Sequence, residues 1–329
     1  MPSEELVIDA RSEQLHRSVG RGVGPGDLSP VRIGVLLHLE ECRPYSPTSL
    51  FGVLVRDIAR RVGVESRALA VRVLLHLPRV ASHEGWLRRW QVERELRISA
   101  ERLRNDARAA SRYLPVRRFQ LCDLSFEEID SSRALPVLTS LHYLRSARPH
   151  SRHFALVDPI DGLPVSLCSL SPLNWKCVGS QICAQFDIRP ERTWDVSRVY
   201  SADNAPPNAI SSLLSRVRRY LRRSVNSLDL LVTAVDPNLG FTGSSYRAAN
   251  WQQWMTVQAR PYLYEHGRYV TPRQLRERFG TSSLIELQAK YPGRFQRSRV
   301  RLLDSMIFCS ILSGETEAVV AQHRRRLHR

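Results

Sequence analysis

Residues 230–251 constrain this chain more than any other stretch, because a buried-strand pattern there leads directly into a turn and a helix start. The apolar run 230–235 stops at Asp236, a loop punctuated by glycine follows, and the next segment carries Tyr246 and Asn250 four residues apart. A strand that ends in a carboxylate, a tight loop and a helix start commonly carries the chemistry of α/β proteins. Because the spacing also fits an ordinary strand–turn–helix connection, the function has to be argued from the rest of the chain.

The charge of the chain points to a polyanionic partner. Its 329 residues include 49 basic and 32 acidic side chains, a formal net charge of +17, and every basic residue except Lys176 and Lys290 is arginine. Surplus positive charge attracts polyanions through counterion release. Nucleic acid, above all double-stranded DNA, is therefore the leading partner class, and an anionic membrane surface is second.

The cysteines and the apolar runs indicate a cytoplasmic protein. No C-x-x-C pair occurs, which favours small buried thiols in a reducing compartment over a zinc site or disulfides. The N-terminus is polar and acidic, unlike a signal peptide, and no apolar run is long enough to span a membrane. With nucleic acid as the leading partner class, no membrane partner is predicted. The six cysteines are Cys42, Cys122, Cys168, Cys177, Cys183 and Cys309.

The pattern divides the chain into four parts. Residues 1–30, rich in glycine and serine, predict a flexible leader, and residues 31–130 predict a mainly helical region. Within that region Ser99 fits an N-cap between two short helices, which leaves open a DNA-reading helix-turn-helix or a plain helical bundle. Residues 131–312 predict an α/β domain, and residues 313–329 a basic tail attracted to phosphate.

The α/β domain is predicted from alternating strand and helix patterns. Asp161-Gly162 favours a hairpin turn, and the predicted helix 209–223 has one apolar stripe and one arginine face. The predicted elements are, in chain order, a helix at 134–144, strands at 153–158, 164–170, 181–188 and 195–202, a helix at 209–223, a strand at 230–235, a hairpin at 262–270 and a basic helical segment from Pro272.

This order resembles the GNAT superfamily of N-acetyltransferases. In that fold a mixed sheet splays open between its fourth and fifth strands to admit an acyl-CoA, so the resemblance implies acetyl-CoA or a related acyl donor. The chain departs from the superfamily at residues 205–209, where APPNA replaces the glycine-rich loop that holds the pyrophosphate. The N-terminus of the following helix still offers free N–H groups to an anion.

Four motifs lie in a fixed order: H-Y at 142–143, S-R-V-Y at 197–200, A-P-P-N-A-x-S at 205–211 and D-P-N-x-G-F-T-G-x-x-Y-R-A-A-N-W at 236–251. Together they resemble the Mom family of bacteriophage proteins, which hypermodify adenine in DNA to a methylcarbamoyl (acetamido) form. The resemblance covers roughly residues 135–300, and the last motif is its most specific part.

The resemblance implies a role for each matching residue. Asp236 would activate the adenine amine, Tyr246 would protonate the leaving group, and the pair His142-Tyr143 completes the catalytic set. Cofactor contacts fall on Arg198, Asn208 and Ser211. Substrate contacts fall on Arg247, Asn250 and Trp251, whose indole would stack on an extruded base.

Each of these residues also has an ordinary structural explanation. Asp236 would cap its turn, Trp251 and His142 would belong to the core, and Asn208 would cap a helix. An iron site at His142, Tyr143 and Asp236 is a weak pattern with only one imidazole, so we assign no metal ligands and leave metal dependence undecided.

The sequence therefore predicts acyl or acetamido transfer to the N6 amine of adenine. Two other hypotheses stay open: a non-catalytic DNA-binding defence or regulatory protein on the same fold, and an acyl- or aminoacyl-transferase acting on tRNA or a small molecule. The sequence decides neither the host, phage or bacterium, nor the oligomeric state, for which a homodimer is compatible.

Overall fold

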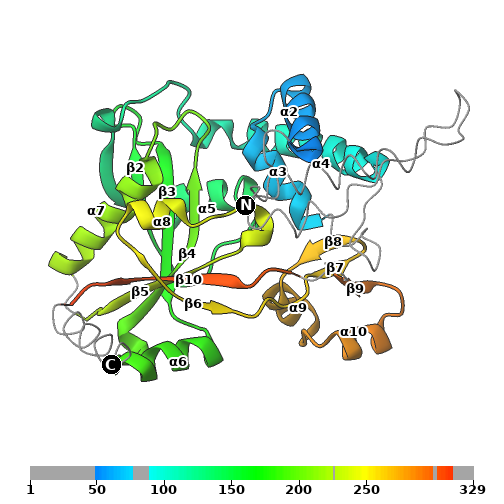
Figure 1. Ribbon diagram of the computed structural model, residues 1–329. Coiled ribbons are helices and arrows are strands. Elements are labelled where there is room, and N and C mark those ends of the chain that lie inside the picture. The colour runs from blue at the N-terminus through cyan, green and yellow to red at the C-terminus, as the bar shows by residue number, and fades with distance from the viewer. Residues whose placement is uncertain (1–48, 77–88, 225–226, 299–301, 314–329) are drawn as a thin grey trace, which may run out of the picture.

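The computed structural model describes residues 49–76, 89–224, 227–298 and 302–313 (Figure 1). The predicted leader and nearly all of the predicted basic tail lie outside these ranges. The described chain forms a large mixed sheet with helices on both faces, a helical region before it and a small second sheet beside it. None of the described helices combines the length and apolar content needed to cross a bilayer.

The main sheet has seven strands in the order β1-β2-β3-β4-β5-β10-β6. All neighbouring pairs are antiparallel except β4 and β5, which run parallel, so the predicted mixed α/β sheet is confirmed. Its strands are β1 (Ser125–Ile129), β2 (Arg152–Val157), β3 (Pro164–Pro172), β4 (Thr193–Ser201), β5 (Leu230–Val235), β6 (Gln252–Val257) and β10 (Ser305–Ile311).

The parallel strands β4 and β5 separate after a short contact. Their pairing runs only from Thr193 opposite Leu230 to Asp195 opposite Val232, although both strands continue beyond it. The register of β4 against β3 also shifts just past this point, so that Ser169 faces Arg198 and Leu170 faces Val196. A bulge of this kind re-aims side chains. The sheet thus opens between its fourth and fifth strands, as the fold resemblance implies.

Helices cover both faces of the main sheet because its central strands alternate two apolar sets. In β2, Phe154 and Leu156 pack with α7 (Ala209–Ser224), whereas Ala155 and Val157 pack with α5 (Ser131–Ser140). Helix α7 buries the predicted apolar stripe and leaves its arginine face half-buried or exposed. The short helix α8 (Ser244–Ala248) lies next to α7.

The helical region is a bundle of α2 (Leu50–Val62), α3 (Ser66–His76) and α4 (Arg89–Ala110). The predicted break at Ser99 is wrong: α4 is continuous, and Ser99 is buried, with its hydroxyl donating to Glu95 (3.3 Å). The helix-turn-helix drawn from that break is therefore not formed. The bundle also shares one core with Tyr262 and Tyr264, which come from the α/β part.

The segment between β6 and β10 forms the small second sheet, in the order β8-β7-β9. The predicted hairpin at 262–270 is confirmed as β7 (Leu263–Glu265) and β8 (Arg268–Val270). Helices α9 (Pro272–Phe279) and α10 (Leu284–Lys290) and strand β9 (Phe295–Arg297) complete it. We call residues 258–304 the insert. In Figure 1 it lies beside the helical region, below α3.

Three other predictions need correction. Residues 181–188 are mostly part of helix α6 (Lys176–Phe186), not a strand. The last third is not wholly helical, because β9 and the central strand β10 fall within it. The helix predicted at 134–144 is shorter, because α5 ends at Ser140. Strand β1 precedes it and begins at Ser125.

Candidate functional site

Asp236 lies at the end of β5, where β4 and β5 have already separated. Its carboxylate caps the short 3-10 turn Pro237–Leu239: Oδ1 accepts from the Asn238 backbone N–H (2.9 Å) and from Asn238 Nδ2 (2.8 Å). The Tyr262 hydroxyl of the insert donates to Oδ2. Asn238 is held in turn by Leu303, with which it exchanges two hydrogen bonds of 2.9 and 2.8 Å. The turn and the insert therefore fix the carboxylate together.

The surroundings of Asp236 raise the proton affinity of its carboxylate. Burial raises the pKa of this carboxyl, although the hydrogen bonds from Tyr262 and Asn238 oppose the rise. A carboxylate has about four lone-pair positions that can accept a hydrogen. The two N–H donors of Asn238 and the Tyr262 hydroxyl occupy three of them, so one position on the carboxylate is left for a proton. Asp236 is thus a fixed acceptor whose affinity for a proton is higher than that of an exposed carboxylate.

His142 and Tyr143 follow the end of α5, and Tyr143 packs near the turn that carries Asp236. Their rings stack with centroids 4.4 Å apart, and Tyr143 also packs against Phe241 (5.5 Å). Burial, and then the charge of Asp236, raises the pKa of the Tyr143 phenol. Tyr143 packs against the same core cluster as Tyr262, whose hydroxyl donates to Asp236, so Tyr143 lies close to the carboxylate.

His142 is neutral in this environment. Burial lowers the pKa of its imidazole well below the ordinary value, and the positive charges of Arg198 and Arg72 lower it further. Its Nδ1 accepts the backbone N–H of Leu144 (3.2 Å), which assigns the ring proton to Nε2. A neutral imidazole with a fixed Nε2–H is a hydrogen-bond donor rather than a base.

Arg198 holds the segment that carries His142 and Tyr143. Its Nε donates to the Ser146 carbonyl (2.6 Å), and its Nη2 donates to the Ser146 hydroxyl (3.0 Å). Arg198 is buried, and its Nη1 donates to the Ser197 carbonyl of its own strand, so all three of its nitrogens are occupied. The geometry favours a positioning role for Arg198 over the predicted contact with a cofactor.

Tyr246, on α8, points its hydroxyl at the opening between the parallel strands. The hydroxyl lies 3.5 Å from Thr233 Oγ1 on β5, and Thr233 in turn donates to the Val196 carbonyl on β4 (2.9 Å). Its ring packs between Phe308 (5.6 Å) and Trp251 (5.4 Å). Burial raises the pKa of the Tyr246 phenol, so the group keeps its proton and can act as an acid.

The three predicted substrate residues have different environments. Trp251 is 3% exposed and belongs to a core cluster that also contains residues of α7, so its ring has no exposed face for a base. The predicted stacking role is therefore corrected to a core role. Arg247 and Asn250 are exposed. Arg247 donates to the Thr242 carbonyl, and Asn250 has a left-handed backbone (φ 61°).

A cavity of about 400 Å³ lies at the N-terminus of α7, against α8. Asn208 and Ser211 both line it, and the Ser211 hydroxyl donates to the Asn208 carbonyl (3.0 Å). Asn208 has a left-handed backbone (φ 64°) instead of the extended backbone typical of an N-cap. The other lining residues are Glu65, Arg67, Ser201, Ala202, Asp203, Ala205, Pro206, Ala209, Ile210, Ser244, Ser245 and Ala248.

The cavity carries two acidic side chains that the sequence did not reveal. Burial, together with the charge of Glu65, raises the pKa of Asp203 to about 6. Glu65 comes from the helical region, where it caps α3 through the Arg67 backbone N–H (2.8 Å). The side of the cavity that carries Glu65 and Asp203 is less favourable for binding a diphosphate than a glycine-rich loop would be.

Two residues of the site escaped prediction. Tyr262 reaches Asp236 from the insert, and Arg72 reaches the end of α5 from the helical region. Neither lies in a motif, and only the aromatic spacing of the 262–270 hairpin distinguishes Tyr262 from other tyrosines. The described residues contain no group of three or more His, Cys, Asp and Glu side chains arranged to hold a metal.

One comparison with known proteins covers all four motifs. The model of the Mom protein family matches residues 123–308, more than half of the chain. None of the curated proteins matches it in sequence. Among solved structures, spermidine N-acetyltransferase from Vibrio cholerae, in complex with CoA and spermine, is 9% identical with a TM-score of 0.34, over 58% of this chain and 96% of that one. Ribosomal-protein-S5-alanine acetyltransferase from Vibrio fischeri is 10% identical with a TM-score of 0.33, over 60% and 97%.

Proposed function

This chain belongs to the Mom protein family, and we propose that it transfers an acyl- or acetamido-type group to the N6 amine of adenine in DNA. One observation carries the proposal. A buried carboxylate, Asp236, stands at the opening of the parallel strands, fixed by Tyr262 and Asn238 and inside the segment that matches the family.

The chemistry of the acceptor requires a base at this position. The lone pair of the adenine amine is delocalised into the ring, so the amine must lose a proton as its new bond to carbon forms. Asp236 is the acceptor for that proton, and its raised pKa improves its match to the task. Because Asp236 is buried, the target adenine has to be flipped out of the DNA stack to reach this carboxylate.

The donor side needs an acid and a polarising group. As the N6–carbon bond forms, the bond between that carbon and the leaving group breaks, and Tyr246 supplies a proton to the departing atom. The Nε2–H of His142 is suited to bind the oxygen of the transferred group, where negative charge develops. Both roles require the protonation state that burial favours, a protonated phenol for Tyr246 and a neutral imidazole for His142.

The donor would lie in the cavity at the N-terminus of α7, with acetyl-CoA or a related acyl donor as the first candidate. The free N–H groups of this 16-residue helix attract an anion. Asn208 and Ser211 line the same cavity and add polar contacts. The net charge of +17 supports DNA as the acceptor.

The test is mass spectrometry of nucleosides from the DNA of cells that express the protein. We expect a modified deoxyadenosine with the wild type and with Asp57→Asn, an exposed carboxylate of α2 that serves as control. The Asp236→Asn variant should yield only unmodified deoxyadenosine. The proposal fails if the folded wild-type protein leaves deoxyadenosine unmodified, or if Asp236→Asn modifies it as well as the wild type does.

The acidic wall of the cavity favours one alternative, a DNA-binding protein on the same fold that has no catalytic activity. Glu65 and Asp203 would repel a diphosphate, Arg67 is the one cation among the described residues that line the cavity, and the loop at 205–209 has no glycine. Calorimetry with acetyl-CoA separates the two. Absence of binding, together with tight and salt-dependent binding of DNA, would favour the non-catalytic protein. Activity without any DNA would instead indicate a tRNA or small-molecule acceptor.

A further inference from the structure

The segment that carries His142 and Tyr143, which we call the His142 loop (residues 141–148), is anchored on one side by the main sheet. Arg198 binds Ser146 with two hydrogen bonds, and Arg148 pairs with the buried Asp195 (2.8 Å). Both sheet residues belong to β4, at the place where β4 leaves β5. These anchors lie inside the family-matched segment.

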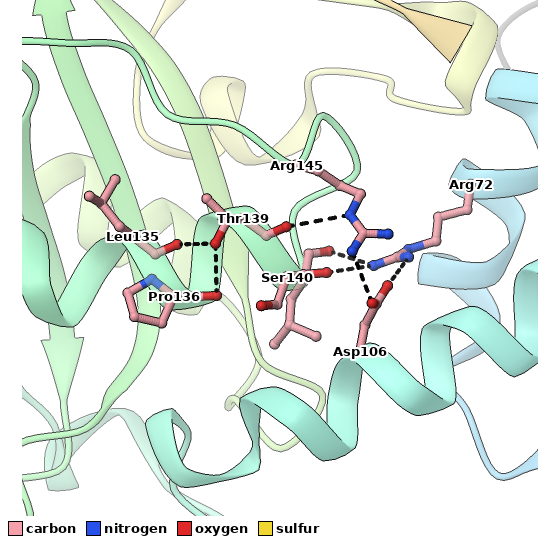
Figure 2. A network of polar contacts seen from close by, with 8 residues as sticks. Arg72, Asp106, Leu135, Pro136, Thr139, Ser140 and Arg145 are labelled. Carbon is pink, nitrogen blue, oxygen red and sulfur yellow. Dashed lines mark hydrogen bonds and ion pairs between the residues drawn. The ribbon is translucent and has the colours of Figure 1, made fainter. Parts of the chain in front are cut away.

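A second anchor comes from the helical region, as Figure 2 shows. Arg72 on α3 donates from Nη2 to the carbonyls of Ser140 (3.0 Å) and Leu141 (3.4 Å), and from Nη1 to Asp106 on α4 (2.7 Å). Asp106 in turn accepts from Arg145 of the His142 loop (3.0 Å). One carboxylate therefore joins an arginine of the bundle to an arginine of the loop.

The Arg72 anchor provides hydrogen-bond donors for backbone carbonyls at the end of α5. Helix α5 ends at Ser140, so the carbonyls at its end have no partner within the helix, and a cation is favoured there. Arg72 supplies donors to two of them while 8% exposed, so its charge depends on Asp106 for compensation. The loop begins at the residue after this helix, and His142 is the next one.

The anchoring residues lie before residue 123, where the match to the family begins. We propose that Arg72 and Asp106 are positioning residues for the His142 loop, so that the helical region 49–110 completes the site instead of forming a separate module. The catalytic consequence rests on the proposed function, whereas the positioning itself does not.

The variants are chosen to separate position from stability. Arg72→Met removes the fork at nearly constant volume, Asp106→Asn removes the charge, and Arg72→Lys keeps the charge while losing the fork. The matched control is Arg192→Met, which breaks another arginine–aspartate pair, with Asp229 (2.7 Å), at the opposite end of β5. Thermal unfolding establishes that each variant is folded. Should Arg72→Met not fold, Asp106→Asn and Arg145→Met carry the test.

The first readout does not depend on activity. The ring C–H resonance of His142, assigned with His142→Gln, is followed by NMR in protein labelled at histidine. We expect this resonance to move in Arg72→Met and Asp106→Asn, to move less in Arg72→Lys and to stay in place in Arg192→Met. An unmoved resonance in both Arg72→Met and Asp106→Asn overturns the proposal.

The second readout is the rate of DNA modification. We expect Arg72→Met to lower kcat by more than about tenfold while KM for DNA changes little, because a misplaced group affects the transition state most. When His142 is already replaced in His142→Gln, adding Arg72→Met should lower kcat by less than about threefold. The reason is that Arg72 is proposed to act by positioning His142. Equal losses in both backgrounds overturn the catalytic part. If the resonance moves but the wild-type protein never modifies DNA, the proposed function fails and the positioning stands.

Discussion

Gly243 offers a direct test of the packing around Tyr246, because a single methyl group can be placed against a known ring. Gly243 precedes α8 with a left-handed backbone (φ 75°). A Cβ built there would lie 2.3 Å from Cζ and 2.5 Å from Cε2 of Phe308. Phe308 is fully buried on β10 and stacks on Tyr246, so its ring has no free space to move into.

Two costs add in Gly243→Ala. The left-handed backbone costs an L-residue about 1–2 kcal/mol, and overpacking a filled core costs about 1–3 kcal/mol. We therefore expect the free energy of unfolding to fall by roughly 2–5 kcal/mol. Gly63→Ala is the matched control, because Gly63 has the same φ of 75° but no atom within 4 Å of the added methyl. It should lose only the backbone share.

Urea unfolding of the wild type and both variants measures the difference. Gly243→Ala should be less stable than Gly63→Ala by about 1–3 kcal/mol, which is the share assigned to the clash with Phe308. Equal losses within about 0.5 kcal/mol would refute the placement of Phe308, and with it the packing that aims Tyr246 at the strand opening.

Two further predictions concern protons. Tyr246→Phe should lower kcat for DNA modification by about 10²–10⁴, the usual contribution of a general acid, yet change urea stability little, because the hydroxyl makes only a 3.5 Å contact with Thr233. Burial raises the pKa of Asp195 from 3.8 to about 6, so between those values the folded state binds more protons than the unfolded state and stability falls as pH rises. Urea unfolding of Asp195→Asn at several pH values should lack that fall, and an unchanged slope would contradict it.

Local patterns were sufficient for several elements of the fold. The Asp161-Gly162 turn, with Gly162 at φ 68°, gives the β2–β3 hairpin, and the apolar stripe of α7 gives its buried face. The strand–turn–helix joint at Asp236 also follows from its neighbours in sequence. In each case the residues that decide the structure lie within a few positions of one another.

The errors arise where distant contacts decide. Strand β10 pairs with β5 across the insert, and nothing near residue 305 indicates that partner. Ser99 has the chemistry of an N-cap, yet its burial and its bond to Glu95 keep it inside one long helix. The segment 181–188 has apolar residues that fit either period, and the burial of Ile182 and Cys183 against other elements selects the helix.

The residues of the candidate site also fall into two groups, those suggested by local motifs and those revealed only by distant contacts. The motifs suggest Asp236, His142 and Tyr246 as candidates, because each is a titratable side chain inside a recognisable motif. They do not identify Tyr262 or Arg72, whose contacts with the site join segments 26 and 68 positions apart. A residue that only positions another side chain does not belong to a recognisable catalytic motif. Sequence alone therefore cannot distinguish it from an ordinary core residue.

Asp236 caps a turn, and the proposed function gives it a second role as the proton acceptor. The two roles are compatible on one side chain. They fall on different oxygens: Asn238 uses Oδ1 with both of its donors, and Tyr262 uses Oδ2. An amide at position 236 keeps an oxygen for Asn238 and turns an NH₂ group toward the Tyr262 oxygen, so the turn survives while the proton acceptor is lost. For that reason Asp236→Asn, rather than an alanine substitution, lets a loss of modified adenine be attributed to chemistry and not to a broken turn.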